Sequence, residues 1–153
     1  MSKSLGNVIL AKYFAQKYGP NAFRYLILNT RYNQVINLSE ELIQQAVDYT
    51  QKIKNLLKKL NFYLYREGIK ITELETPRRA EIITSLLNNL NTVKVLFFLE
   101  QTINSLNKII DKKEDDSEEL QKAISDFYFT LDLLGFKFDL TPYNLTTKLL
   151  IRE

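Results

Sequence analysis

The 153-residue sequence contains neither cysteine nor histidine. Without cysteine the chain has no disulfide bond, no thiol nucleophile and no thiolate metal ligand. Without histidine it cannot use imidazole for acid–base catalysis, and only carboxylates remain as metal-ligand side chains. We therefore predict that this chain alone binds no metal ion.

Glycine and proline are also scarce, with four and three residues respectively. No apolar run approaches the roughly 20 residues that span a bilayer, and the first residues do not read as a signal peptide. We therefore expect a cytoplasmic protein with no membrane partner. The composition is otherwise ordinary for a globular protein, and its formal net charge of +3 permits nucleic-acid binding without establishing it.

Apolar residues recur at three- and four-residue steps along most of the chain. Near the end, Leu120, Ile124, Phe127, Leu131 and Leu134 keep a strict four–three spacing. The pattern predicts six helices, with approximate ends, over residues 8–18, 20–27, 40–67, 77–89, 91–110 and 120–134. Six helices with short connections predict an all-α fold, a helical bundle whose neighbouring helices run mostly antiparallel.

Residues suited to helix ends support these bounds. Ser39, Thr76 and Asn91 are suited to N-caps, because a short polar side chain accepts a hydrogen bond from an N–H group of the first turn. Gly68 and Gly135 follow apolar stretches, where glycine typically ends a helix.

The first seven residues, Met1-Ser2-Lys3-Ser4-Leu5-Gly6-Asn7, precede the first predicted helix. Lys3 supplies a point charge between two serine hydroxyls, and Gly6 allows the backbone to turn its N–H groups inward. The helix that follows adds the positive end of its dipole. The segment is suited to bind an anion, although on composition alone a flexible terminal segment is the simpler interpretation.

These seven residues resemble the KMSKS signature of class I aminoacyl-tRNA synthetases and the Leu-Gly-Asn that often follows it. The first lysine of the signature would lie immediately before Met1. The resemblance implies that Met1, Ser2, Lys3 and Ser4 bind ATP, and that Lys3 is catalytic because it neutralises charge on the departing pyrophosphate. Losing one such group typically costs roughly 3 kcal/mol, about a hundredfold in rate.

Later segments resemble one member of this class, the cysteinyl-tRNA synthetases. The resemblance lies in Arg24–Leu28, Tyr32, Ile36–Glu41, Asn88–Thr92 and Leu133–Gly135. The sequence departs from the family where a leucine replaces an aromatic at position 38 and where amides replace acids at positions 88 and 89. The order and spacing of the segments are more specific than any one of them.

The resemblance implies that this chain is the C-terminal part of such an enzyme. Residues 1–38 would form the signature loop and the connecting helices that contact the tRNA stem, and residues 39–153 the helical anticodon-binding domain, often called DALR-type. The parent enzyme uses ATP and selects cysteine at a Cys/His zinc site in an upstream catalytic domain. Because that domain is absent here, we expect the chain alone to be inactive and to bind no cofactor, with the missing domain and cysteine-specific tRNA as its partners.

Basic side chains are candidates for contacts with tRNA phosphates, which give affinity but no sequence readout. The candidates are Lys12, Lys17, Arg24, Arg31, Lys52, Lys54, Lys58 and Lys59. Tyr63, Tyr65 and Tyr143 are conceivable stacking platforms for unpaired bases. For each of these residues the structural interpretation is the simpler one, because helix-surface lysines usually only face solvent and tyrosines at helical spacing usually pack.

Two alternatives remain at this stage. Tyr18–Tyr25 also resembles the corresponding segment of methionine-type class I ligases. A helical module that binds protein, and carries the loop by coincidence, would instead expose an apolar stripe and have little salt-dependent affinity for RNA.

Overall fold

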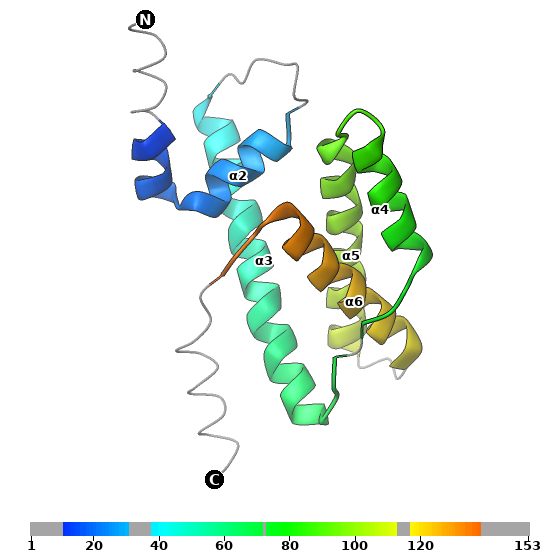
Figure 1. Cartoon of the computed structure of the whole chain (residues 1–153). Coiled ribbons are helices and arrows are strands. Elements are labelled where there is room, and N and C mark those ends of the chain that lie inside the picture. Colours follow the sequence, from blue (N-terminus) through cyan, green and yellow to red (C-terminus); the bar gives the residue numbers. More distant parts are fainter. Residues whose placement is uncertain (1–10, 31–37, 72, 113–116, 139–153) are drawn as a thin grey trace, which may run out of the picture.

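The computed structural model describes residues 11–30, 38–71, 73–112 and 117–138 (Figure 1). Residues 11–18 are helical. The helices that follow are α2 (Pro20–Leu28), α3 (Glu40–Glu67), α4 (Pro77–Leu87), α5 (Thr92–Lys112) and α6 (Ser117–Leu134). No β-strand occurs in these ranges, so the predicted all-α bundle is confirmed for the part of the chain that the structure describes.

Helices α3 to α6 run alternately down and up, so consecutive helices are antiparallel, as predicted (Figure 1). Helices α3 and α5 therefore share one direction. Their contacts agree, because the Tyr49 hydroxyl lies 3.5 Å from the carbonyl oxygen of residue 96 and Lys59 Nζ lies 3.4 Å from Asn107 Oδ1. The residue numbers of the two partners differ by 47 in the first contact and by 48 in the second. A nearly constant difference in residue number is typical of two parallel helices.

The predicted helix ends are confirmed where a capping side chain was recognised. The Ser39 hydroxyl accepts the N–H of Leu42 at 3.2 Å, and Gly68 ends α3 in the left-handed conformation with φ of 67°. The Thr76 hydroxyl accepts the N–H of Arg79 at 3.1 Å, and Asn91 Oδ1 accepts the N–H of Lys94 at 3.2 Å. These bonds satisfy donors that the first turn of a helix leaves unpaired.

Two predicted ends were wrong by a few residues. Helix α4 stops at Leu87 rather than at residue 89, because Asn89 and Leu90 take positive φ values of 60° and 51° and reverse the chain. Helix α6 begins at residue 117 rather than 120, within a charged run that was assigned to the preceding connection.

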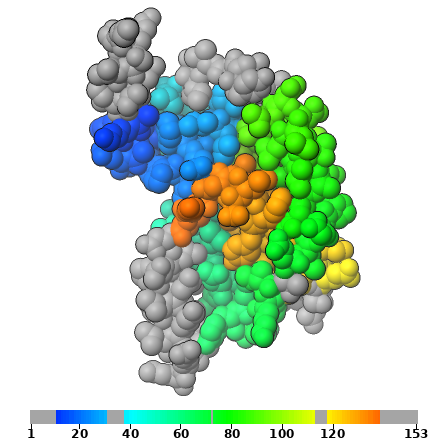
Figure 2. All heavy atoms as spheres, in the orientation of Figure 1, coloured from blue at the N-terminus to red at the C-terminus, as the bar shows by residue number. Residues whose placement is uncertain are grey.

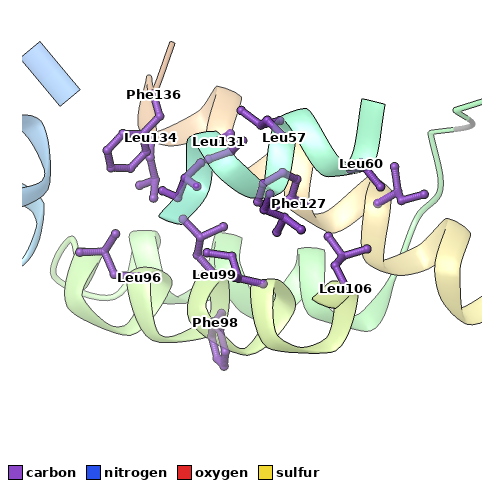
Figure 3. Packing of buried hydrophobic residues seen from close by; sticks show 14 of the residues in the cluster. Leu57, Leu60, Leu96, Phe98, Leu99, Leu106, Phe127, Leu131, Leu134 and Phe136 are labelled. Atoms are coloured by element: carbon purple, nitrogen blue, oxygen red, sulfur yellow. The ribbon is translucent and has the colours of Figure 1, made fainter. Parts of the chain in front are cut away.

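The main core lies between α3, α5 and α6. On α5, Leu96, Leu99 and Leu106 point toward the other two helices, where Leu60 and Phe127 meet them (Figure 3). All five side chains are buried. Burying one such side chain contributes about 1.5 to 3 kcal/mol, so this cluster is the main source of bundle stability.

A second, smaller cluster joins the N-terminal helices to α3. Phe14, Ala22, Leu26 and Ala46 are buried together, and Phe14 also packs against Tyr18 with ring centroids 4.8 Å apart. In the space-filling view, the blue residues 11–30 lie against the orange residues at the end of α6 and just beyond it (Figure 2). Residues 11–30 are therefore packed on the bundle.

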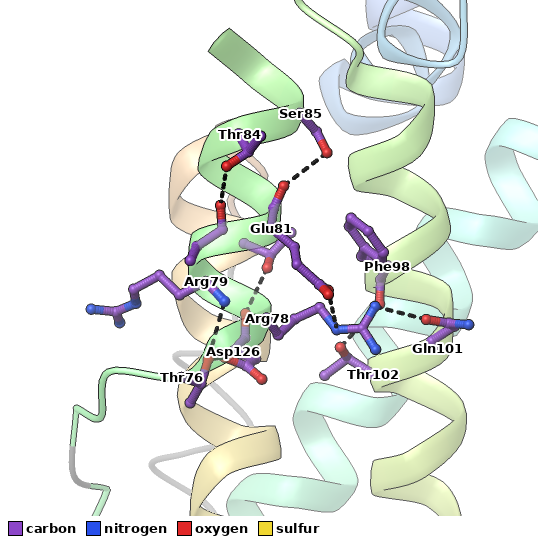
Figure 4. A network of polar contacts seen from close by, with 12 residues as sticks. Thr76, Arg78, Arg79, Glu81, Thr84, Ser85, Phe98, Gln101, Thr102 and Asp126 are labelled. Carbon is purple, nitrogen blue, oxygen red and sulfur yellow. Dashed lines mark hydrogen bonds and ion pairs between the residues drawn. The ribbon is translucent and has the colours of Figure 1, made fainter. Parts of the chain in front are cut away.

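A polar network fixes the start of α4 against α6 (Figure 4). The Thr76 hydroxyl, which also caps α4, donates to the buried carboxylate of Asp126. The Arg78 guanidinium lies 4.5 Å from the centre of the Phe98 ring, and that of Arg79 lies 4.2 Å from the centre of Phe129. Burial raises the pKa of Asp126, while the Thr76 hydrogen bond and the two arginines oppose that rise.

Candidate nucleic-acid interface

The predicted ATP-binding residues Met1, Ser2, Lys3 and Ser4 lie outside the described residues, as do Arg31 and Tyr143. Their predicted roles therefore stay predictions. The described residues that follow the signature-like segment place two candidate cations, Lys12 and Lys17, on the exposed side of the helical segment 11–18.

Lys17 is held over two tyrosine rings. Its ammonium lies 5.1 Å from the centre of the Tyr18 ring and 5.9 Å from that of Tyr13. A hydrogen bond to Tyr18, followed by charge interactions with both tyrosines, raises the pKa of Lys17. Lys12 has no recorded hydrogen bond or ion pair to a described residue and is exposed, so it is free to meet a phosphate.

Arg24 has a structural partner in the bundle. Its Nη1 donates to the carbonyl oxygen of Leu134 at 3.4 Å, at the C-terminal end of α6. A guanidinium at that end also complements the negative pole of the helix dipole. A phosphate contact by Arg24 would compete with this bond.

The four candidate lysines of α3 point in two directions. At about 100° per residue, Lys52 and Lys59 are about 20° apart around the helix, whereas Lys54 and Lys58 are turned by about 200° to 240° from Lys52. The sequence analysis named the four as candidates without assigning them to faces of the helix. The helix geometry instead divides them into two pairs on different faces.

Lys52 and Lys59 face α5 and are already paired. Lys52 forms an ion pair with Glu100, and Lys59 forms one with Asp111 while lying 3.4 Å from Asn107 Oδ1. Such partly exposed pairs contribute up to about 1 kcal/mol each. A phosphate that binds these lysines must displace or share their carboxylates.

A groove between α3 and α5 carries these two lysines. It is lined by Asp48, Gln51, Lys52, Asn55, Leu56, Lys59 and Asn107. The sequence interpretation missed its amides, although Gln51 and Asn55 are four residues apart on one helix face and hydrogen-bond at 2.9 Å. The groove therefore presents the side-chain amides as neutral hydrogen-bond donors and acceptors. Beside them lie the two lysines, whose charges are balanced by Glu100 and Asp111.

Lys54 and Lys58 lie half-buried on another face of α3. No hydrogen bond or ion pair to a described residue is recorded for Lys54, whereas Lys58 does interact with a neighbour. Lys54 is therefore the α3 lysine whose charge is the most available to a phosphate.

The end of α3 carries exposed aromatic rings beside an arginine. Phe62 and Tyr65 are 43% and 38% exposed, and the Arg66 guanidinium lies 5.7 Å from the centre of the half-buried Tyr63 ring and 6.0 Å from that of Phe62. Exposed rings next to a cation can stack unpaired bases. The sequence analysis named Tyr63 and Tyr65 but missed Phe62 and Arg66. Because these two residues are four apart on a helix, their spacing could have indicated that they are neighbours.

Comparison with known proteins places these features in a family context. A family model described as "tRNA synthetases class I (C) catalytic domain" matches residues 1–48. A cysteine--tRNA ligase of Mycoplasma mycoides subsp. mycoides SC is 36% identical over 89% of this chain, and one of Mesoplasma florum is 33% identical over 94%. A cysteine--tRNA ligase of Onion yellows phytoplasma is 34% identical over 97% of the chain. The chain is homologous to part of the cysteine--tRNA ligases.

The resemblance seen in the sequence is thereby confirmed, but only part of each ligase is covered. The chain spans 31% of the Mycoplasma ligase and 32% of each of the other two, about a third of their length. No solved structure matches the chain.

The family model covers some of the candidate residues and not others. The family model covers Lys3, Lys12, Lys17, Arg24 and Arg31 but ends before the four lysines of α3. It also runs past the predicted domain boundary at residues 38/39, into the first turns of α3. That boundary stays a prediction.

Two further observations concern ligands and membranes. Within residues 11–30, 38–71, 73–112 and 117–138, no three side chains of the metal-binding types come together as a candidate site. None of the helices described there is long and apolar enough to cross a membrane.

Proposed function

We propose that this chain is the C-terminal, tRNA-binding portion of a cysteine--tRNA ligase. The observation that carries the proposal is the similarity to ligases of that name over 89% to 97% of the chain. The parent enzyme would activate cysteine with ATP and transfer it to cysteine tRNA in the cytoplasm. The three relatives described above are cysteine--tRNA ligases, which favours this family over the methionine-type alternative.

In this proposal the two predicted parts have separate tasks. Residues 1–38 carry the signature-like segment, in which Met1, Ser2 and Ser4 bind ATP and Lys3 stabilises negative charge on the departing pyrophosphate. Residues 39–153 hold the tRNA, so that its acceptor end reaches the activated amino acid. The second part would therefore contribute to catalysis by holding the tRNA in the geometry that the transfer needs.

The zinc site expected of the parent enzyme would not lie in this chain. A site that selects a thiol needs cysteine or histidine ligands, and the sequence has neither. Amino-acid selection is therefore assigned to the rest of the ligase, which is also the chain's expected protein partner.

Contacts with tRNA phosphates would be made first by the cations that no acid neutralises. These are Lys12 and Lys54, which make no hydrogen bond or ion pair to a described residue, whereas Lys58 already interacts with a neighbour. Lys52 and Lys59 would contribute by exchanging Glu100 and Asp111 for phosphate oxygens. Phe62, Tyr65 and Arg66 supply a surface for unstacked bases.

The test is a titration of the chain with cysteine tRNA at two salt concentrations. Methionine tRNA and a cysteine tRNA with a swapped anticodon serve as competitors. We expect preferential binding to cysteine tRNA that weakens when the anticodon is swapped. Equal and strongly salt-dependent binding to all three RNAs would reduce the role to a phosphate-holding scaffold, and absence of binding at low salt would contradict the proposal.

One observation favours a protein contact as a second role. Leu87 and Leu90, at the connection between α4 and α5, are 83% and 57% exposed. Contiguous exposed apolar surface marks interaction sites, and a partner that binds here would cover both leucines. A chain that binds no tRNA, but associates with another protein through this turn, would support the protein-interaction alternative.

A further inference from the structure

Helix α2 is attached to the segment that follows α6 by two hydrogen bonds between Asn21 and the backbone of Lys137. Asn21 Nδ2 donates to the carbonyl oxygen of Lys137 at 2.7 Å, and Asn21 Oδ1 accepts the N–H of Lys137 at 3.3 Å. The side-chain amide thus pairs with both polar groups of one backbone residue. Two bonds to the same residue fix orientation as well as distance.

Arg24, one turn further along α2, holds the same end of α6. Its Nη1 donates to the Leu134 carbonyl, and its guanidinium lies over Gly135. Gly135 has φ of +78°, and a Cβ there would come within 2.6 Å of Arg24 Nη1. The absence of a side chain at position 135 is what allows the guanidinium to reach the carbonyl.

The other end of α2 is held by α5 and α3. The Thr92 hydroxyl donates to the Leu28 carbonyl at 2.6 Å, and the Tyr25 ring stacks on Tyr49 with centroids 4.4 Å apart. Helix α2 is therefore held at both ends by three different helices of the bundle.

We propose that Asn21 and Arg24 are positioning residues that lock α2 onto α6, so that α2 and the bundle move as one rigid body during transfer to tRNA. The inference rests on the proposed function for its catalytic consequence. Residues 1–48, which match the catalytic-domain model, contain α2, whereas α6 lies far outside that match. The lock joins these two regions without touching a substrate.

The lock itself is tested by a distance measurement on the full chain. Because the sequence has no cysteine, spin labels can be placed at two exposed positions through Gln16→Cys and Asn104→Cys. We expect a narrow distribution of label distances that broadens with Asn21→Ala or Arg24→Ala. The matched control is Asn29→Ala, an exposed asparagine at the other end of α2, which should leave the distribution unchanged. Unchanged distributions in the Asn21 and Arg24 variants would overturn the lock.

A pair of glycine substitutions separates the lock from backbone strain. Gly135→Ala and Gly68→Ala both place alanine at positive φ, but only the first displaces Arg24, since nothing lies within 4 Å of the second. We expect only Gly135→Ala to broaden the distances, with no further effect of Gly135→Ala once Arg24→Ala is present. Equal broadening in both glycine variants would mean that strain, not the lock, controls α2.

The catalytic consequence is tested in a complete ligase that contains this chain. Asn21→Ala and Arg24→Ala should slow single-turnover transfer to saturating tRNA by roughly tenfold or more, because small misplacements are costly in catalysis. Pyrophosphate exchange, which needs no tRNA, should stay within about twofold of the parent in both variants, and the tRNA Kd should do so for Asn21→Ala. Unchanged transfer, or a Kd that rises as much as transfer falls, would overturn the positioning role. A parent ligase that neither exchanges pyrophosphate nor binds tRNA would instead refute the proposed function, and the distance measurement would still decide the lock.

Discussion

At the scale of single residues, Asp126 links the stability of the bundle to pH. Burial raises its folded-state pKa above the ordinary value, so the folded state binds a proton more readily than the unfolded chain. The contribution is fully present below the unfolded pKa and is lost as pH rises through the folded pKa. We therefore expect Asp126→Asn, which keeps an acceptor for Thr76, to gain stability relative to wild type as pH rises.

Urea unfolding at about pH 4 and about pH 7 measures this difference, since the ordinary pKa of aspartate is about 3.9. Asp132→Asn is the control, because Asp132 lies exposed on the same helix. A free-energy difference between wild type and Asp126→Asn that is independent of pH would show that folding does not shift the pKa of Asp126.

Lys52 and Lys54 form a second residue-scale comparison. If Lys54 meets a phosphate and Lys52 is held by Glu100, Lys54→Ala should reduce the slope of log K against log salt by about 0.7 to 0.9, and Lys52→Ala by less. Lys52→Ala should instead lower the free energy of unfolding by up to about 1 kcal/mol. RNA titrations over a salt series, with urea unfolding of each variant, measure both effects. The reverse ranking of slopes would place RNA in the α3–α5 groove.

At the scale of elements, the connection between α4 and α5 stores backbone strain. Leu90 has φ of 51°, a conformation that costs an ordinary residue about 1 kcal/mol and glycine almost nothing. We expect Leu90→Gly to raise the free energy of unfolding by about 0.5 to 1 kcal/mol. Leu87→Gly is matched to it as an exposed leucine at the end of α4, and should lower stability by about 1 kcal/mol. Thermal unfolding of both variants measures these changes. If both substitutions raised, or both lowered, the stability relative to wild type, this account would be contradicted.

How far the sequence predicts each element depends on whether its ends are marked locally. Both ends of α3 were predicted because Ser39 and Gly68 act on their own neighbours. The end of α4 was not, because Asn89 and Leu90 adopt positive φ without a glycine to indicate it. The start of α6 lies in a charged run whose composition alone favours a solvated connection.

The partners of the candidate site residues could not be predicted in this way. Lys52 meets Glu100 across 48 residues, and Arg24 meets Leu134 across 110. Such pairs depend on how whole helices pack, which no local pattern of residue types records. The sequence therefore predicted which side chains carry charge, but not which charges the fold already uses.

At the scale of the whole molecule, we expect the chain alone to form no cysteinyl adenylate. In its proposed role, Lys3 acts on departing pyrophosphate only where ATP and the amino acid are held, and the chain spans about a third of the length of its relatives. Pyrophosphate exchange with ATP and cysteine, assayed with the purified chain, measures this. A complete ligase containing the same residues is the positive control, and exchange by the isolated chain would contradict the proposed division of labour.

The attachment of α2 to α6 also has a consequence for the order of folding. Asn21 and Lys137 are 116 residues apart in the sequence. Bringing them together costs chain entropy before their contacts can stabilise the structure. Residues 11–28 share a cluster of four buried hydrophobic residues, whereas α3 to α6 enclose most of the buried apolar surface. The bundle should therefore fold first and the N-terminal helices should dock last, opening again as a separate cooperative unit. Native-state hydrogen exchange should find faster exchange for amides of α2 than for those of α5, and equal protection would mean that the whole chain opens at once.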